Sequence, residues 1–343
     1  MKAKSGMLLA GMVLLMITYL SSYALPGPTL NNNQPQKQLY YAAFSEINQM
    51  LSGGKPPNFK KAVFLMENAY LNGAWSYEQF NTKISEIAIK LRQMIEKRHL
   101  EKFRTAGNWA AFTYMTDSIQ ENNFRPFTYD FDHFLDDKDP TVGFVTKLLR
   151  TNKGNCNSLP FLYKILVEEL GTSGFLALAP IHCYIKHKDE QGKWVNLEMT
   201  SGSFARDEWI MQETGVTVEQ IKSGIYMQAL TLKESIALVL KELAVNYQFQ
   251  FGIEDFDLTI CNTALRYFPT SVNLLMVKYE HYRLALRQTQ KLQKDQEVEA
   301  YQMLKTIDAR LIELGYKYSS KDEYNNWIKQ NKLSKKTTIT ANK

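Results

Sequence analysis

The 343-residue sequence predicts an α+β fold in which helices flank a small antiparallel sheet. Helical spacing dominates up to about residue 119, three short strand-like segments follow between residues 175 and 199, and helical patterns return after Thr231. With 45% hydrophobic and 12% aromatic residues, the chain can fill a substantial core. We therefore expect a folded globular protein of two or three modules.

Residues 1–24 have the pattern of an export signal. A basic start precedes an uncharged apolar run, Met7–Leu20, and Ser22 and Ala24 stand where a signal peptidase would cleave. The run is shorter than the ~20 residues that span a bilayer. We predict cleavage and an exported, periplasmic or extracellular protein with no membrane span; an uncleaved membrane anchor is the alternative.

Charge and cysteine content narrow the function classes. Lys and Arg total 41 against 35 Asp and Glu, and a net charge of +6 is too small to indicate nucleic-acid binding. The three cysteines, Cys156, Cys183 and Cys261, do not make the disulfide framework of a stapled exported protein. At least one thiol is therefore expected to be free.

The composition along the chain predicts a division into segments after the signal. Residues 25–38, rich in Pro and Asn, indicate a linker, and residues 331–343 a solvated basic tail. Between them we expect an N-terminal helical region at 39–125, a core at 126–230 and a second helical region at 231–330.

Apolar stripes at helical spacing are interpreted as core. In the N-terminal region they are Phe59, Val63, Met66 and Tyr70, then Phe80, Ile84, Ile87, Leu91 and Met94. Four later stretches, 233–252, 255–269, 271–288 and 299–316, predict stacked helical hairpins. A faint tetratricopeptide pattern near Pro269 has no clean period behind it.

An acidic stretch, "YDFDHFLDDKD" from Tyr129 to Asp139, carries carboxylates that a calcium ion would favour. It lacks the glycine and the closing glutamate of the recognised calcium loop. We interpret it as a solvated loop or a helix cap, and the sequence implies no metal and no organic cofactor.

The stretch "NKGNCNSLPFLYKILVEELG", Asn152–Gly171, predicts a helix that opens beside a cysteine. Its buried stripe and its end signals are Leu159, Leu162, Leu166 and Leu170, with Pro160 in the first turn and Gly171 after the last. Cys156 then lies at the helix N-terminus, where the helix dipole favours a thiolate.

Two interpretations of such a cysteine compete: a small buried hydrophobe or a reachable nucleophile. For Cys261, inside the apolar stretch "LTICNTAL", we adopt the first. Cys156 has small polar neighbours, Asn155 and Asn157 among them, which favours a reachable thiol at a loop-to-helix junction.

His182 is the candidate base for this nucleophile, because it begins the strand-like stretch "HCYIKH". The other histidines are interpreted as exposed or near a turn: His99, His133, His281 and His187. A hairpin turn centred on Glu190 would place Glu198 opposite His182 as the orienting acid.

The hairpin pattern separates two faces, and a slip of one residue would destroy the pairing of His182 with Glu198. The face predicted to be core carries Cys183, Ile185, Val195 and Leu197; the face predicted to be the site carries His182, Tyr184, Trp194, Asn196 and Glu198. Asn196 is a rival or supporting partner for the imidazole, and Asn155, Trp194 and Tyr184 are further supporting candidates.

A cysteine at a helix start, a histidine on one strand and an acid on the next resemble, in that chain order, the transglutaminase-like superfamily with its papain-like core. Cys156, His182 and Glu198 match its three catalytic positions. The wider pattern from Asn58 to Arg287 is similar to the subgroup with tetratricopeptide-like C-terminal helices. The family usually has aspartate at the third position, so the longer Glu198 requires the strands to shift slightly.

This resemblance implies an exported cysteine hydrolase, a peptidase or amidase, or an acyl transferase that acts on peptide or protein amides through a thioester. The alternative is a non-catalytic scaffold that keeps the core and binds a protein partner through its C-terminal helices.

Overall fold

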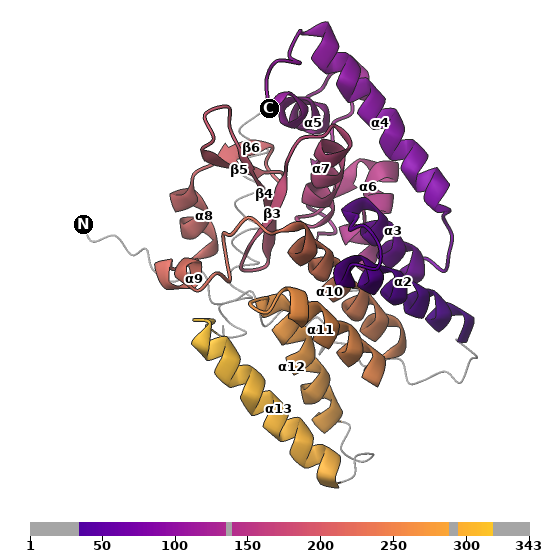
Figure 1. The fold of residues 1–343 in the computed structure, drawn as a ribbon, viewed down its shortest axis with the longest axis vertical. Coiled ribbons are helices and arrows are strands. Elements are labelled where there is room, and N and C mark those ends of the chain that lie inside the picture. Colours follow the sequence, from indigo (N-terminus) through magenta and orange to yellow (C-terminus); the bar gives the residue numbers. More distant parts are fainter. Residues whose placement is uncertain (1–33, 135–138, 288–293, 318–343) are drawn as a thin grey trace.

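The computed structural model describes residues 34–134, 139–287 and 294–317, and the fold is α+β and mostly helical (Figure 1). Within these ranges a four-stranded antiparallel sheet and a two-stranded parallel sheet are present, so the predicted α+β class is confirmed. The predicted signal at 1–24 and the basic tail at 331–343 lie outside the described residues. No helix in the described ranges is both long and apolar enough to cross a membrane.

The N-terminal region consists of four helices: α2 (Gln34–Ser52), α3 (Phe59–Tyr70), α4 (Tyr77–Lys97) and α5 (Ala106–Thr116). The predicted stripes of α3 and α4 are buried, apart from Tyr70, which is half-buried. The helical region begins earlier than the expected start at Leu39, because α2 opens inside the segment interpreted as a linker. Pro35 is tolerated in a first turn, and Tyr40, Ala43 and Ile47 supply a buried stripe.

The middle of the chain leads from these helices to the candidate nucleophile. Its elements are η1 (Gln120–Asn122), β1 (Thr128–Tyr129), η2 (Pro140–Gly143), α6 (Val145–Thr151), β2 (Lys153–Gly154) and α7 (Ser158–Glu169). Strands β1 and β2 pair in parallel, with Tyr129 beside Gly154. Helix α7 follows the prediction, with Pro160 in its first turn and Gly171 at a φ of +70° after its end.

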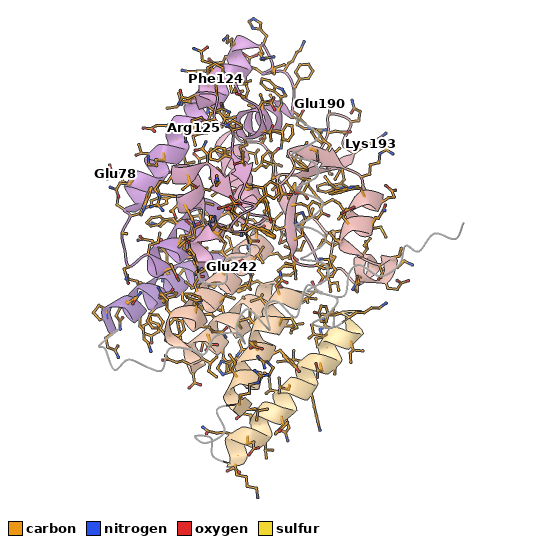
Figure 2. The ribbon with its side chains drawn as sticks, turned by 180° about the vertical axis from the view of Figure 1, so that it is seen from behind. Glu78, Phe124, Arg125, Glu190, Lys193 and Glu242 are labelled. Atoms are coloured by element: carbon orange, nitrogen blue, oxygen red, sulfur yellow. The ribbon has the colours of Figure 1, made fainter. Side chains whose placement is uncertain are left out.

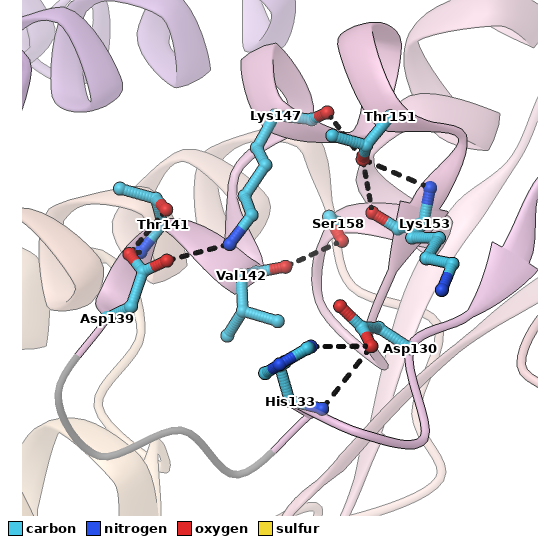
Figure 3. A network of polar contacts seen from close by, with 9 residues as sticks. All are labelled: Asp130, His133, Asp139, Thr141, Val142, Lys147, Thr151, Lys153 and Ser158. Atoms are coloured by element: carbon cyan, nitrogen blue, oxygen red, sulfur yellow. Dashed lines mark hydrogen bonds and ion pairs between the residues drawn. The ribbon is translucent and has the colours of Figure 1, made fainter.

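At the two described ends of the acidic stretch before α6, Asp130 and Asp139 serve as caps and ion-pair partners (Figure 3). Asp139 accepts a hydrogen bond from the N–H of Thr141 at 3.0 Å and pairs with Lys147 at 2.7 Å. Asp130 accepts one from the N–H of His133. No cluster of three or more His, Cys, Asp or Glu side chains suited to a metal ion occurs among the described residues.

The antiparallel sheet has the strand order β3-β4-β5-β6: β3 (Phe175–Ala179), β4 (His182–Lys188), β5 (Trp194–Glu198) and β6 (Ser203–Ala205). The first three strands lie at the positions that the sequence predicts. Because Ala179 pairs with His182, β3 and β4 are joined by a tight turn of Pro180 and Ile181.

The predicted register of the β4–β5 hairpin is wrong by two residues. Ile185 pairs with Leu197, so the same register places Thr200, not Glu198, opposite His182. The turn centres on Gln191, because the N–H of Asp189 donates to the carbonyl of Lys193 at 2.8 Å and Gly192 takes a φ of +82°. A shift of two residues keeps every side chain on its predicted face, since side chains alternate with period two.

The face of the sheet that was predicted to carry the site is covered, as the core face is. Tyr184, Lys186 and Asn196 on the polar face are buried. Figure 1 draws the sheet between α7 on one side and α8 (Asp207–Thr214) on the other. The Nδ2 of Asn196 donates to the Oδ1 of Asp207 at 2.7 Å, which ties the polar face to α8.

After α9 (Val218–Lys222), the C-terminal region follows the predicted helices: α10 (Leu232–Phe251), α11 (Asp255–Tyr267), α12 (Val272–Arg287) and α13 (Lys294–Glu313). Each packs on the next, and α10 also packs on α2 and α3. His281 was expected to be exposed but is buried. Its Nδ1 lies 2.7 Å from the Oδ2 of Asp257 on α11.

The turn of the β4–β5 hairpin carries Glu190 and Lys193 (Figure 2).

Candidate active site

Asn155 fixes the start of α7 and therefore the position of Cys156. Its Oδ1 accepts hydrogen bonds from the N–H groups of Asn157 at 2.9 Å and Ser158 at 3.2 Å. In return, the N–H of Asn155 donates to the Oγ of Ser158 at 3.0 Å. This arrangement satisfies backbone N–H groups that a helix start leaves without intrahelical partners.

Asn157, on the other side of the cysteine, has a different role. It occupies the N-cap position of α7 but makes no side-chain capping bond. Its Nδ2 donates instead to the Oε1 of Glu242 on α10 at 3.3 Å. The two asparagines therefore hold Cys156 from both sides, one by capping α7 and one by contact with a C-terminal helix.

Gly154, just before this loop, is required by close packing. A Cβ atom there would lie 2.4 Å from the Oγ of Ser158 and 2.9 Å from the Cδ1 of Leu148. A side chain at this position would displace the residue on which Asn155 caps the helix. The turn that presents Cys156 thus depends on a glycine at residue 154.

The Cys156 thiol is half-buried and lies at the β3–β4 turn. Its Sγ is 3.7 Å from the carbonyl oxygen of Ile181, the residue directly before His182. Ile181 has a φ of +51°, a conformation that β-branched residues rarely adopt. Backbone strain of this kind persists where the surrounding structure enforces it, often at functional sites.

His182 and Glu198 are brought together across the hairpin. The Nε2 of His182 hydrogen-bonds the Oε2 of Glu198, whose side chain is 3% exposed. The other carboxylate oxygen accepts from the N–H of Thr200 at 2.9 Å and from its Oγ1 at 2.7 Å. Because the two residues are diagonal neighbours in the observed register, the long glutamate side chain makes the contact possible.

The electrostatics of this pair favour an imidazolium. Burial lowers the pKa of His182, but the Glu198 carboxylate and a side-chain hydrogen bond with Cys156 raise it, to about 10. Burial raises the pKa of Glu198, yet His182 and Thr200 hold it below its ordinary value. A protonated His182 held by the Glu198 carboxylate can stabilise a thiolate on Cys156 by its charge, which is how a histidine activates a cysteine nucleophile.

The supporting candidates are only partly brought to the site. Tyr184 stacks on His182 with ring centroids 6.2 Å apart and planes at 13°. Glu198, not Asn196, holds the Nε2 of His182, and the Nδ2 of Asn196 donates to Asp207 and to the carbonyl of Ala205. Trp194 packs on Phe175 at the start of β5, the end away from Glu198, and is 47% exposed.

Three residues near the site were missed by sequence reasoning: Ile181, Thr200 and Tyr129. Burial and the charges of Cys156 and Glu198 raise the pKa of Tyr129, so its phenol lies near both. The pairing of β1 with β2 places Tyr129 beside Gly154, close to the nucleophile. Thr200 follows Glu198 by two residues in "EMTSG", and that spacing was the only available signal.

The other two cysteines differ from Cys156. Cys183 is 2% exposed and Cys261 is fully buried, and burial raises the pKa of both thiols. They therefore remain protonated at neutral pH, as the structural interpretation of both residues predicts. Among the described cysteines, Cys156 alone combines partial exposure with a histidine neighbour.

Two cavities of the described structure lie elsewhere. One of about 610 Å³ is lined by residues between Lys97 and Trp109, and one of about 440 Å³ by residues between Ala74 and Glu86. Neither includes a residue of the Cys156, His182 and Glu198 constellation. We assign them no role in its chemistry.

Comparisons of the chain with protein-family models, with curated proteins and with solved structures found no match in any of the three.

Proposed function

We propose that the protein is an exported cysteine hydrolase with a transglutaminase-like, papain-like core that acts on peptide or protein amides. The observation that carries this proposal is the constellation at the start of α7: a half-buried Cys156 beside His182, whose Nε2 is held by Glu198. The order of these groups, helix first and antiparallel strands after it, supports the resemblance to that superfamily.

In the proposed reaction the Cys156 thiolate attacks the amide carbonyl carbon, and the carbonyl oxygen takes up the negative charge. The C–N bond then breaks as His182 gives a proton to the departing amine, leaving a thioester on Cys156. Because Nε2 of His182 is bonded to Glu198, the ring nitrogen that exchanges protons is Nδ1. A water molecule, deprotonated by His182, hydrolyses the thioester to a carboxylic acid and restores the thiol.

Two groups support these steps. Glu198 keeps its charge beside His182 and stabilises the imidazolium that donates the proton in the first step and is formed again in the second. In the proposed reaction the backbone N–H of Cys156, which lies just before α7, donates to the developing oxyanion. Hydrolysis is the first choice for the second step, and transfer of the acyl group to an amine is the second.

The test is amide turnover by purified protein on a fluorescently labelled casein, with a fluorescent primary amine added in a parallel assay. We expect cleavage or deamidation that Cys156→Ala lowers by about 10³-fold or more. Cys261→Ala is the matched control, since Cys261 is a buried cysteine on α11, and it should retain activity. Incorporation of the amine in place of hydrolysis would assign acyl transfer.

The alternative, a scaffold that binds a protein partner, is favoured by one observation on α13. Val298, Tyr301 and Ile312 are 49%, 54% and 68% exposed and share one face of that helix. Its opposite face, with Ile307 and Leu311, is buried. Full biological function in the Cys156→Ala variant would support the scaffold over the hydrolase.

A further inference from the structure

The side chain of Asn157 is turned away from its own helix. The N-cap residues of α3, α4 and α10, which are Asn58, Ser76 and Thr231, each accept a backbone hydrogen bond from their helix. Asn157 makes no such bond and donates to Glu242 on α10. A favoured capping residue is therefore used as a contact between the nucleophile loop and the C-terminal helices.

Glu242 does not carry an isolated charge at this place. Its Oε1, which accepts from Asn157, also pairs with the Nζ of Lys241. The Lys241 side chain is 4% exposed and that of Glu242 is 17% exposed, so the pair is largely shielded from water. Buried charges of this kind need a partner of opposite charge, and here Lys241 and Glu242 are each other's partner.

The pair lies within electrostatic reach of the candidate site. Burial raises the pKa of Cys183, and the charges of Cys156, Glu198, Lys241 and Glu242 also act on it. Figure 2 labels Glu242 in the middle of the molecule, where the N-terminal and C-terminal helices meet. Asn157 directly follows Cys156 and its side chain binds Glu242, so a charge left unbalanced on Lys241 or Glu242 lies next to the nucleophile loop.

Other titratable groups face Cys156 from three strands. They are Tyr129 on β1, His182 and Cys183 on β4, and Glu198 on β5, with Asp130 beside Tyr129. Among the groups described around the thiol, Lys241 and Glu242 are the two that come from the C-terminal helical region.

We propose that Glu242 is a positioning residue for Cys156, acting through Asn157, and that Lys241 neutralises its charge beside the nucleophile. This inference rests on the proposed function, because it assigns a task to α10 in the same site. The contact couples the C-terminal helices to the reactivity of the thiol, so an event that moves α10 changes the alkylation rate of Cys156.

The positioning role is tested by alkylating Cys156 with iodoacetamide in Glu242→Ala and Glu242→Gln. Both variants leave Lys241 without its carboxylate, so the difference between them isolates the acceptor for Asn157. The glutamine variant keeps that acceptor and should be alkylated on the order of tenfold faster than the alanine variant. Glu254→Ala is the matched control, because Glu254 binds Lys37 and Tyr247 at the far end of α10. Equal rates in Glu242→Ala and Glu242→Gln would overturn the positioning role.

If Lys241 neutralises the charge of Glu242, removing Lys241 should change the pH dependence of Cys156 alkylation. Lys241→Met leaves a bare carboxylate near the thiol and should move the alkylation profile of Cys156 to higher pH, by on the order of one unit. The double variant Lys241→Met/Glu242→Gln carries neither charge and should return the profile to the wild-type position. Lys241→Gln replaces Lys241→Met if the latter does not fold.

The outcomes separate this inference from the function on which it rests. Slow alkylation of Cys156 in the wild-type protein would overturn the proposed function and the inference together. Fast wild-type alkylation with no shift in Lys241→Met, or with the same shift in the double variant, would overturn the inference alone. A loss of melting temperature without a change in rate or profile would assign the pair a structural role only.

Discussion

Cys156 owes its position to the residues on either side of it. Asn155 caps α7 through its Oδ1, and Asn157 binds Glu242. The polar stretch predicted a reachable thiol at a helix start, and the structure places it there. Which asparagine caps the helix could not be predicted, because that depends on backbone angles that two adjacent, chemically identical residues do not reveal.

Replacing Glu198 with glutamine tests the acid at the residue scale. The glutamine keeps the size and the bonds to Thr200, but it removes the charge that raises the pKa of His182. We expect alkylation of Cys156 at pH 7 to slow by about 10- to 100-fold. Glu208→Gln, on the exposed start of α8, is the control and should leave the rate unchanged. An equal rate in Glu198→Gln would contradict the role of the acid.

The contact between His182 and Glu198 predicts that the stability of the protein depends on pH. The folded-state pKa of His182, about 10, lies above the unfolded value of 6.5, so the native state binds more protons between these values. The contribution of His182 to stability is fully present below pH 6.5 and is lost as the pH rises towards 10. Urea unfolding across this range should show that loss in the wild type and a smaller loss in His182→Gln. Parallel curves would contradict the assignment.

At the scale of elements, α6 depends on a carboxyl group from another helix. Glu67 of α3 is fully buried and accepts from the N–H groups of Val145 at 2.6 Å and Thr146 at 2.8 Å. Glu67→Ala leaves both groups unpaired and should lower the free energy of unfolding by about 2–4 kcal/mol. Urea titration measures this, with the exposed Glu86→Ala on α4 as control. A cost no larger than that of Glu86→Ala would contradict the capping role.

The β4–β5 hairpin shows which features of an element the sequence reveals. Alternation of side chains predicted both strands and the face of each residue, and those predictions survive a register error of two residues. The error came from the turn, where Asp189 and Gly192 define a three-residue loop centred on Gln191. His182 and Glu198 still make contact despite this error, because the glutamate side chain is long enough to reach a diagonal neighbour on the adjacent strand.

At the scale of the molecule, the regions distinguished in the sequence share one connected core. Buried apolar residues extend from Tyr40 in α2 through α7 and the sheet to Tyr316 after α13. Tyr40 of α2, for example, contacts the rings of both Tyr247 and Phe251 on α10. The spacing and alternation of apolar residues predicted the helices and the sheet. Contacts between segments so distant in the chain leave no local pattern, so their packing into one body could not be predicted.

A connected core predicts cooperative unfolding. We expect calorimetry to show one transition for the described body. Tyr40→Ala in α2 and Leu162→Ala in α7 should each lower the midpoint temperature of that transition, because each should lower the free energy of unfolding by about 2–5 kcal/mol. Two separate transitions, with Tyr40→Ala moving one and Leu162→Ala the other, would show that the N-terminal and central regions fold independently.

The central claim is that Cys156 is an activated nucleophile, and the most direct measurement is its alkylation across pH. The protein is titrated with iodoacetamide, the modified cysteine is mapped by mass spectrometry, and His182→Ala is measured in parallel. An activated Cys156 should be labelled fast and alone, the labelling should persist below neutral pH, and it should slow in the variant. Slow labelling with an ordinary thiol profile, or equal labelling of Cys156 and Cys261, would contradict it.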